Sequence, residues 1–122
     1  MLKLLIAVRS GVFADSLAQT LSSQFEIHNC STGASTQQLI EAVRPDVLVI
    51  DLRLNDQDGR IVLDHCRFRP PVILALTDLV NEEIMHWAAD AAIDALIIIP
   101  CSTKYVTEYI ECIAEKAPSP EA

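Results

Sequence analysis

The chain has 122 residues, 51% of them hydrophobic, and only three glycines. This composition fits one globular domain with one core and excludes the disordered and fibrous classes. The formal net charge is −8, which argues against direct nucleic-acid binding, because phosphate backbones are bound by basic surfaces. No apolar run approaches the roughly 18–20 residues that span a bilayer. The apolar start of the chain meets Arg9 too early for a signal peptide, so we expect a cytoplasmic protein without membrane contact.

Five strand patterns alternate with five helical patterns along the chain. In the first half these are a strand over Leu4–Val8, a helix with the apolar stripe Phe13, Leu17 and Leu21, a strand over Phe25–Cys30, a helix with Leu39, Ile40 and Val43, and a strand over Val47–Ile50. In the second half they are a helix with Val62, Leu63 and Cys66, a strand over Val72–Leu76, a helix with Ile84, Ala88 and Ala91, a strand over Ala95–Ile99, and a helix with Val106, Ile110 and Ile113. The stripes recur at helical spacing.

Polar residues mark where three of these helices begin. Ser35 and Gln38 form a capping-box pattern that predicts the start of the second helix. Asn81 is the predicted N-cap of the fourth helix and Ser102 that of the fifth, because their side-chain oxygens accept hydrogen bonds from free backbone N–H groups.

The strand patterns predict a parallel sheet. The third, fourth and fifth runs are apolar throughout, as in strands buried on both faces, whereas Phe25–Cys30 alternates as an edge strand does. Right-handed crossovers then give an α/β fold, a three-layer, doubly wound (βα)5 sandwich of the flavodoxin-like type with strand order 2-1-3-4-5. We expect this domain to cover residues 1–116, with residues 117–122 a tail or the start of a linker to an output domain.

The four cysteines are scattered and predict free thiols. No C-x-x-C pair joins them, and the three histidines add no metal-ligand spacing. They are Cys30, Cys66, Cys101 and Cys112.

Ligands of open parallel sheets bind outside the carboxyl ends of the strands. Asp51 stands at such an end, directly after a buried run, where a carboxylate is costly unless it is solvated, paired or functional. The alternative is an ordinary turn aspartate. Thr77 ends the next strand, and its alternative role is a hydroxyl bonded to local backbone.

Two segments carry a resemblance to a known family. Residues 47–59, an apolar strand followed by Asp51 and a loop that closes in Asp58-Gly59, resemble the receiver domains of bacterial response regulators, the CheY-like family. Residues 71–77 resemble the fourth receiver strand with its switch residue, here Thr77, and the spacing to Ile99-Pro100 matches that to the family's Lys-Pro pair. The resemblance covers residues 1 to about 116 and implies two-component signalling, with Asp51 at the phosphoacceptor position of a phosphorelay.

The chain also departs from that family's pattern. Relatives place two acidic residues after the first strand, where Val8 and Arg9 stand here, and a lysine before the proline, where Ile99 stands. Mg²⁺ prefers several oxygen ligands, so we expect weak or absent Mg²⁺ binding, no other cofactor, and impaired phosphorylation of Asp51. One hypothesis is that the Arg9 side chain pairs with Asp51 in place of the metal; the alternative is that it points to solvent.

A protein-interaction surface is expected on the face of the fourth helix, fifth strand and fifth helix, which the resemblance associates with dimers and partners. Its candidate residues are Trp87, Leu96, Lys104, Tyr105, Glu108 and Tyr109. Aromatic side chains are enriched at interfaces, but Trp87 lies beside an apolar stripe and has covering the core as its alternative role. Leu96 stands where receivers often carry a switching aromatic residue.

These observations predict a degenerate receiver, or pseudo-receiver, without enzyme activity. It would act as an interaction or dimerisation module and as the N-terminal part of a transcription regulator. One alternative is a working receiver phosphorylated on Asp51. Another is a flavodoxin-like domain that binds a small ligand; the absence of a phosphate-binding loop and of a nucleophile–base pair disfavours it, and disfavours an enzyme.

Overall fold

The computed structural model describes residues 1–117, in which strands and helices alternate as the sequence predicts. The strands are β1 (Leu2–Ala7), β2 (Phe25–Cys30), β3 (Val47–Asp51), β4 (Val72–Thr77) and β5 (Ala95–Ile98). The helices are α1 (Gly11–Leu21), α2 (Gly33–Val43), α3 (Gly59–His65), α4 (Glu82–Asp90) and α5 (Thr103–Ile113), followed by the 3-10 turn η1 (Ala114–Lys116). Of the predicted tail, residues 118–122 lie outside the described part.

All five strands pair in parallel in one sheet, in the order β2-β1-β3-β4-β5. This order and the flavodoxin-like fold class are confirmed. The register aligns Asp51 with Leu76 on the neighbouring strand, so the ends of β3 and β4 lie together at the carboxyl edge of the sheet.

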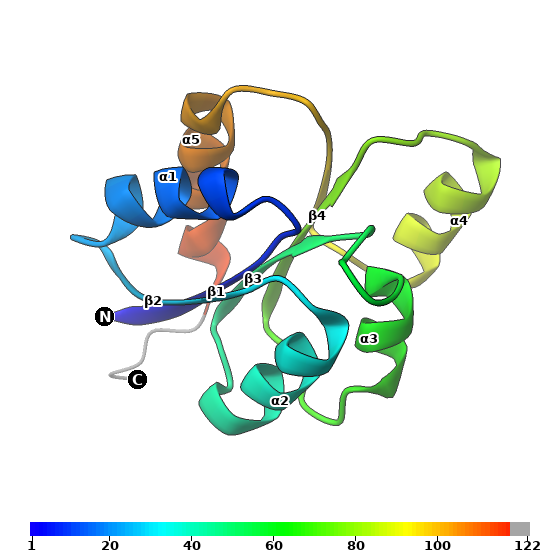
Figure 1. Ribbon diagram of the computed structural model, residues 1–122, viewed down its shortest axis with the longest axis horizontal. Helices are drawn as coiled ribbons and strands as arrows, with labels where there is room; N and C mark the ends of the chain where they lie inside the picture. The colour runs from blue at the N-terminus through cyan, green and yellow to red at the C-terminus, as the bar shows by residue number, and fades with distance from the viewer. Residues whose placement is uncertain (118–122) are drawn as a thin grey trace.

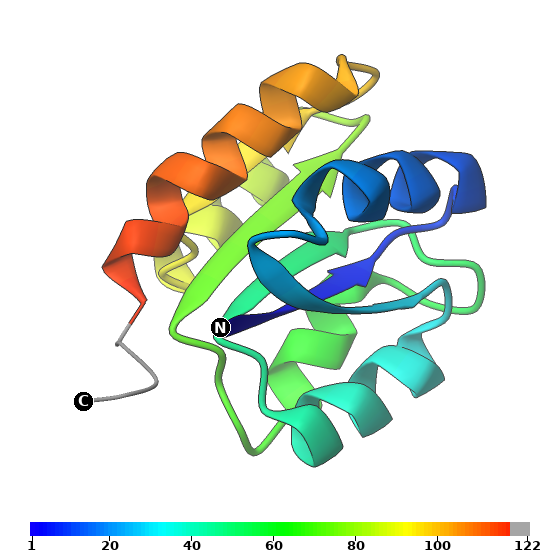
Figure 2. The same cartoon turned by 90° about the vertical axis from the view of Figure 1, so that its left-hand side faces the viewer.

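Helices cover both faces of the sheet (Figures 1 and 2). On one face, α1 and α5 pack against β1, β3, β4 and β5 through a core that includes Leu17 and Ile110. On the other face, α2, α3 and α4 contribute Ile40, Val62 and Ile84 to a second core. The central strands are buried on both sides, which explains their uninterrupted apolar sequence.

Two of the three predicted helix caps are confirmed and one is wrong. The side chains of Asn81 and Ser102 accept hydrogen bonds at the starts of α4 and α5. The cap of α2 is Thr32 rather than Ser35, and the Thr32 hydroxyl accepts from the backbone N–H of Ser35 at 3.1 Å. The prediction failed because the carboxylate of Asp56, far along the chain, also accepts from the first N–H groups of α2, a contact that local sequence does not reveal.

The remaining general predictions concern thiols and the membrane. All four cysteines are free, as expected. Within residues 1–117, no helix has the length and apolarity needed to cross a bilayer.

Candidate functional site

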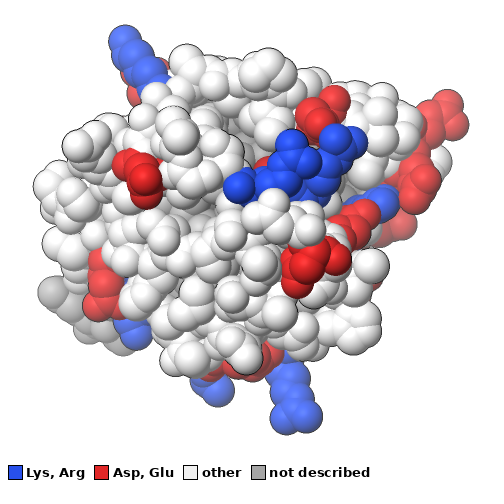
Figure 3. Space-filling model, viewed as in Figure 1, with Lys and Arg blue, Asp and Glu red and all other residues white. Residues whose placement is uncertain are grey.

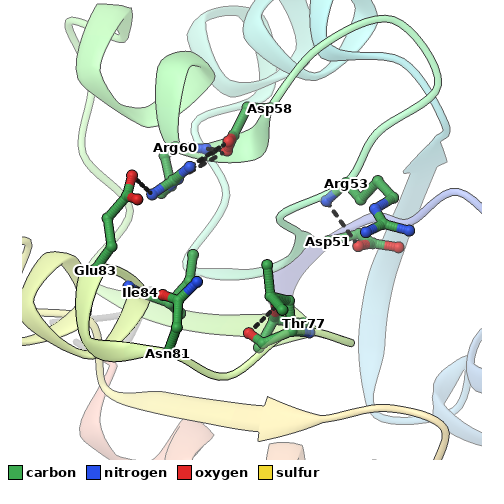
Figure 4. Close-up of polar contacts among 9 residues, drawn as sticks. Asp51, Arg53, Asp58, Arg60, Thr77, Asn81, Glu83 and Ile84 are labelled. Atoms are coloured by element: carbon green, nitrogen blue, oxygen red, sulfur yellow. Dashed lines mark hydrogen bonds and ion pairs between the residues drawn. The ribbon is translucent and has the colours of Figure 1, made fainter.

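Asp51 lies at the carboxyl end of β3 with only 7% of its surface exposed. One carboxylate oxygen accepts the backbone N–H of Arg53 at 2.9 Å, drawn in Figure 4. The other accepts the backbone N–H of Arg9 at a longer 3.4 Å. The loops after β3 and β1 therefore hold the carboxylate through their backbones.

The pKa of Asp51 is raised above its ordinary value. Burial disfavours the ionised form, and this effect exceeds the opposing one of the two backbone N–H groups and the nearby Arg9 charge. Asp51 is therefore a carboxyl group whose charge is only partly compensated.

Two residues that follow β1, the aliphatic Val8 and the basic Arg9, lie next to Asp51. Val8 is buried, with 2% of its surface exposed, and Arg9 is exposed. No ion pair between the Arg9 guanidinium and the Asp51 carboxylate occurs among the described residues, which favours the alternative that the Arg9 side chain faces solvent. The backbone N–H of Arg9 makes the contact with Asp51 instead.

The donor set around Asp51 does not match the preference of Mg²⁺ for several oxygen ligands. Val8 supplies no side-chain donor, Arg9 is cationic, and the carboxylate of Asp78 pairs with Arg53 at 3.0 Å. Across residues 1–117, no three or more His, Cys, Asp or Glu side chains gather in a metal-binding arrangement. The residues present thus do not fit the metal that the family resemblance implies.

A pocket of about 210 Å³ lies beside Asp51 at the ends of β1, β3 and β5. Its walls are mainly apolar and include Val8, Phe13, Ile99 and Pro100. Ile99 lines the Asp51 pocket, where it offers carbon atoms and no cation.

Thr77 is buried at the end of β4, and its hydroxyl is satisfied locally. It donates to the carbonyl of Leu79 at 2.9 Å and accepts the backbone N–H of Leu79 at 3.1 Å. This geometry agrees with the local-backbone alternative for Thr77.

A second pocket of about 240 Å³ lies on the other side of the loop after β3 and is rimmed by paired charges. Arg60 of α3 contacts Asp58 at 2.7 Å and Glu83 of α4 at 3.2 Å, which links the two helices (Figure 4). Figure 3 shows basic groups gathered near the carboxyl ends of the strands, with acidic groups beside them. Sequence reasoning missed the Arg60–Glu83 pair because it joins two separate helices, whereas Asp58 and Arg60 lie two residues apart at the start of α3.

Gly59 is a further residue whose role the sequence did not reveal. A Cβ atom at this position would lie 2.5 Å from the carbonyl oxygen of Asp51. The chain therefore needs glycine here, where α3 begins against the end of β3.

The predicted interaction face divides into core and surface residues. Trp87 and Leu96 pack against the core of the α2–α4 side, and Tyr109 packs against the other core. Lys104 and Glu108 are exposed, with 3.9 Å between their charged groups, and Tyr105 is exposed as well. The core alternative for Trp87 is therefore supported.

Two exposed apolar side chains on this face, Met85 and Ile98, were missed. Met85 of α4 and Ile98 of β5 join Tyr105 of α5 among the large apolar residues that remain about half exposed. The sequence signal was weak, because Met85 and Ile98 sit within otherwise apolar helix and strand patterns.

Comparisons with known proteins agree with this architecture. No known family model matches the chain. Over 99 residues the chain is 27% identical to the response regulator protein VraR of Staphylococcus aureus (strain NCTC 8325 / PS 47), covering 77% of this chain. The alignment covers 47% of VraR, so the chain spans about half the length of the curated relatives it matches.

Solved structures show the same fold. A CheY-like response regulator receiver domain protein from Methanospirillum hungatei JF-1 superposes with a TM-score of 0.84 at 24% identity, covering 94% of this chain and 95% of that one. A DNA-binding response regulator of the LuxR family from Staphylococcus aureus gives 0.80 at 21% identity, covering 93% and 99%.

The fold is that of CheY-like receiver domains, with an aspartate at the end of β3. In sequence the chain is similar to the response regulator VraR.

Proposed function

We propose that the chain is an atypical receiver in which Mg²⁺-dependent phosphorylation of Asp51 is impaired, and that it regulates through protein contacts. The observation that carries this proposal is the surroundings of Asp51. A single carboxylate faces the buried Val8, the apolar Ile99 and the loop of Arg9.

Phosphoryl transfer depends on positioning and on neutralising negative charge. A metal held by several carboxylates and a lysine beside the phosphoryl group are the means that the family resemblance implies. Val8, Arg9 and Ile99 replace those groups, and losing one such stabiliser commonly costs about 10²–10³ in rate. On this proposal Mg²⁺ binds weakly or not at all, and the chain has no enzyme activity of its own.

The output of this receiver would be contact with protein. The face of α4, β5 and α5 supports this part, because each element exposes one large apolar side chain: Met85, Ile98 and Tyr105. We propose that this face binds a partner or a second copy of the chain. The net charge of −8 supports the absence of direct nucleic-acid binding by this segment.

The relatives suggest the setting. One structural neighbour is a DNA-binding response regulator, and the matched curated relatives are about twice as long as the aligned segment. We therefore propose that the chain is the N-terminal regulatory part of a cytoplasmic transcription regulator.

A working phosphoacceptor is the second candidate, favoured by the position of Asp51 at the carboxyl end of β3. Incubation with acetyl phosphate and Mg²⁺, followed by intact-mass measurement, separates the two. We expect no stoichiometric phosphoryl gain. A gain that disappears in Asp51→Asn would replace the proposed function with this second candidate.

A further inference from the structure

The pocket beside Asp51 combines an apolar wall with one carboxylate. Phe13 of α1, Leu76 of β4 and Pro100 contribute carbon surface from three separate elements. Ligand sites typically have this composition, mostly apolar walls with a few polar groups that fix orientation.

The pocket is sized for a small ligand. Its volume of about 210 Å³ lies between the roughly 150 Å³ of a cavity that admits benzene and the roughly 300 Å³ at which drug-sized sites begin. One six-membered ring with a short substituent matches this volume.

Asp51 retains capacity to accept a hydrogen bond from such a ligand. An ionised carboxylate has about four acceptor positions, and the described residues supply one N–H to each oxygen, from Arg53 and Arg9. A hydroxyl or N–H group in the pocket would satisfy a further acceptor position.

The charges around Asp51 disfavour a cationic ligand. The Arg9 charge acts on the Asp51 carboxyl, and the guanidinium of Arg53 lies in the loop that follows Asp51, where it pairs with Asp78. The charges of Asp51, Asp78, Arg9 and Arg53 sum to zero, so they supply no excess negative charge to offset the cost of desolvating a cation in a mainly apolar pocket. The favoured ligand is therefore neutral.

We propose that the Asp51 pocket binds a neutral, mainly apolar small molecule that donates one hydrogen bond to the Asp51 carboxylate. This inference rests on the proposed function, because it assigns a ligand to the place where a standard receiver holds its metal and phosphoryl group. The ligand would then act as the signal to which the receiver responds.

Four probes of similar size test this assignment. Benzyl alcohol carries a donor, anisole only an acceptor, ethylbenzene neither, and benzylamine a positive charge. Titrations followed by amide chemical shifts should give saturable changes near Val8, Cys101 and Asp51, with a dissociation constant for benzyl alcohol on the order of 1 mM. Benzyl alcohol should bind at least about tenfold more tightly than the other three, because it alone donates a hydrogen bond to the charged carboxylate without carrying a positive charge into an apolar pocket.

A filled pocket provides the matched control. Cys101 lines the pocket, so Cys101→Phe should abolish benzyl alcohol binding, whereas Cys112→Phe on the exposed side of α5 should leave it unchanged. Asp51→Leu should remove the preference for benzyl alcohol over ethylbenzene.

A measurement on the unsubstituted protein tests the same site without relying on a variant that could misfold. Benzyl alcohol should slow the alkylation of Cys101 by iodoacetamide and leave the alkylation of Cys112 unchanged. Peptide mass mapping measures the extent of alkylation at each cysteine. The inference is overturned if benzyl alcohol gives no saturable change and no protection of Cys101, or if ethylbenzene binds equally well. Phosphorylation of Asp51 by acetyl phosphate would instead contradict the proposed function, whether or not benzyl alcohol binds.

Discussion

Asp51 and Asp58 lie seven residues apart in sequence at the same edge of the sheet, yet their environments differ. Asp51 is held by two backbone N–H groups beside an apolar pocket, and burial raises its pKa. Burial acts on Asp58 in the same direction, but hydrogen bonds and charge from Arg60 outweigh it and lower the pKa. The fold fixes where a carboxylate stands, whereas its neighbours decide whether it is easily ionised.

The largest expected effect comes from giving Asp51 the neighbours that standard receivers have. The combined change Val8→Asp, Arg9→Asp and Ile99→Lys should raise the rate of phosphorylation by acetyl phosphate and Mg²⁺ at least about 100-fold, since each electrostatic stabiliser is worth about 10²–10³. Intact-mass time courses measure the rate. The same variant carrying Asp51→Asn is the control and should gain no phosphoryl group; an unchanged rate would show that these three positions are not what limits the chemistry.

The close approach of α3 to the end of β3 gives the next largest effect. Gly59→Ala places a Cβ atom against the Asp51 carbonyl, and such overpacking typically lowers the free energy of unfolding by about 1–3 kcal/mol. Urea denaturation measures it. Gly11→Ala is the matched control, because no other atom lies within 4 Å of the added carbon, and it should leave stability unchanged or slightly raised. Equal losses in both variants would refute the steric account.

Neutralising Asp51 should stabilise the fold. Because the pKa of Asp51 is raised in the folded state, its ionisation lowers stability as pH rises from its ordinary value near 4 through the raised value. Asp51→Asn should therefore increase the free energy of unfolding by about 1 kcal/mol at neutral pH. The gain should vanish in acid, where the wild-type carboxyl is protonated in both the folded and the unfolded state. Urea denaturation at several pH values measures the gain, and a gain of the same size at every pH would contradict this prediction.

Neutralising Asp58 should have the opposite and smaller effect. A lowered pKa contributes stability above the ordinary pKa, and this contribution is lost as pH falls through the lowered value. Asp58→Asn keeps an N-cap oxygen for α3 but loses the charge opposite Arg60, so stability at neutral pH should fall by about 0.5 kcal/mol. Raised stability in this variant would contradict the assigned pairing.

The sequence predicts the sheet better than it predicts the contacts between loops. Uninterrupted apolar runs such as Val47–Ile50 reflect burial on both faces, so strand order and fold class follow from local pattern and general topology rules. Asp56 accepts hydrogen bonds from the first N–H groups of α2, and Glu83 of α4 pairs with Arg60 of α3. These two contacts join separate elements and carry no periodic signal.

The site itself was predicted in position and only partly in geometry. Val8, Asp51 and Ile99 meet at one pocket because the carboxyl ends of parallel strands share an edge. The direction of the Arg9 side chain was not predictable, since the loop after β1 contacts Asp51 through its backbone N–H group. Side-chain direction in a loop depends on local backbone geometry that residue identity alone does not give.

Calorimetric titration with Mg²⁺ tests the central claim most directly, because the claim concerns the oxygen donors around Asp51. The wild-type chain should show no saturable heat at millimolar Mg²⁺, and adding beryllofluoride should leave the amide resonances of Arg9 and Asp51 unchanged. Saturable Mg²⁺ binding that disappears in Asp51→Asn, or a beryllofluoride adduct at Asp51, would contradict it.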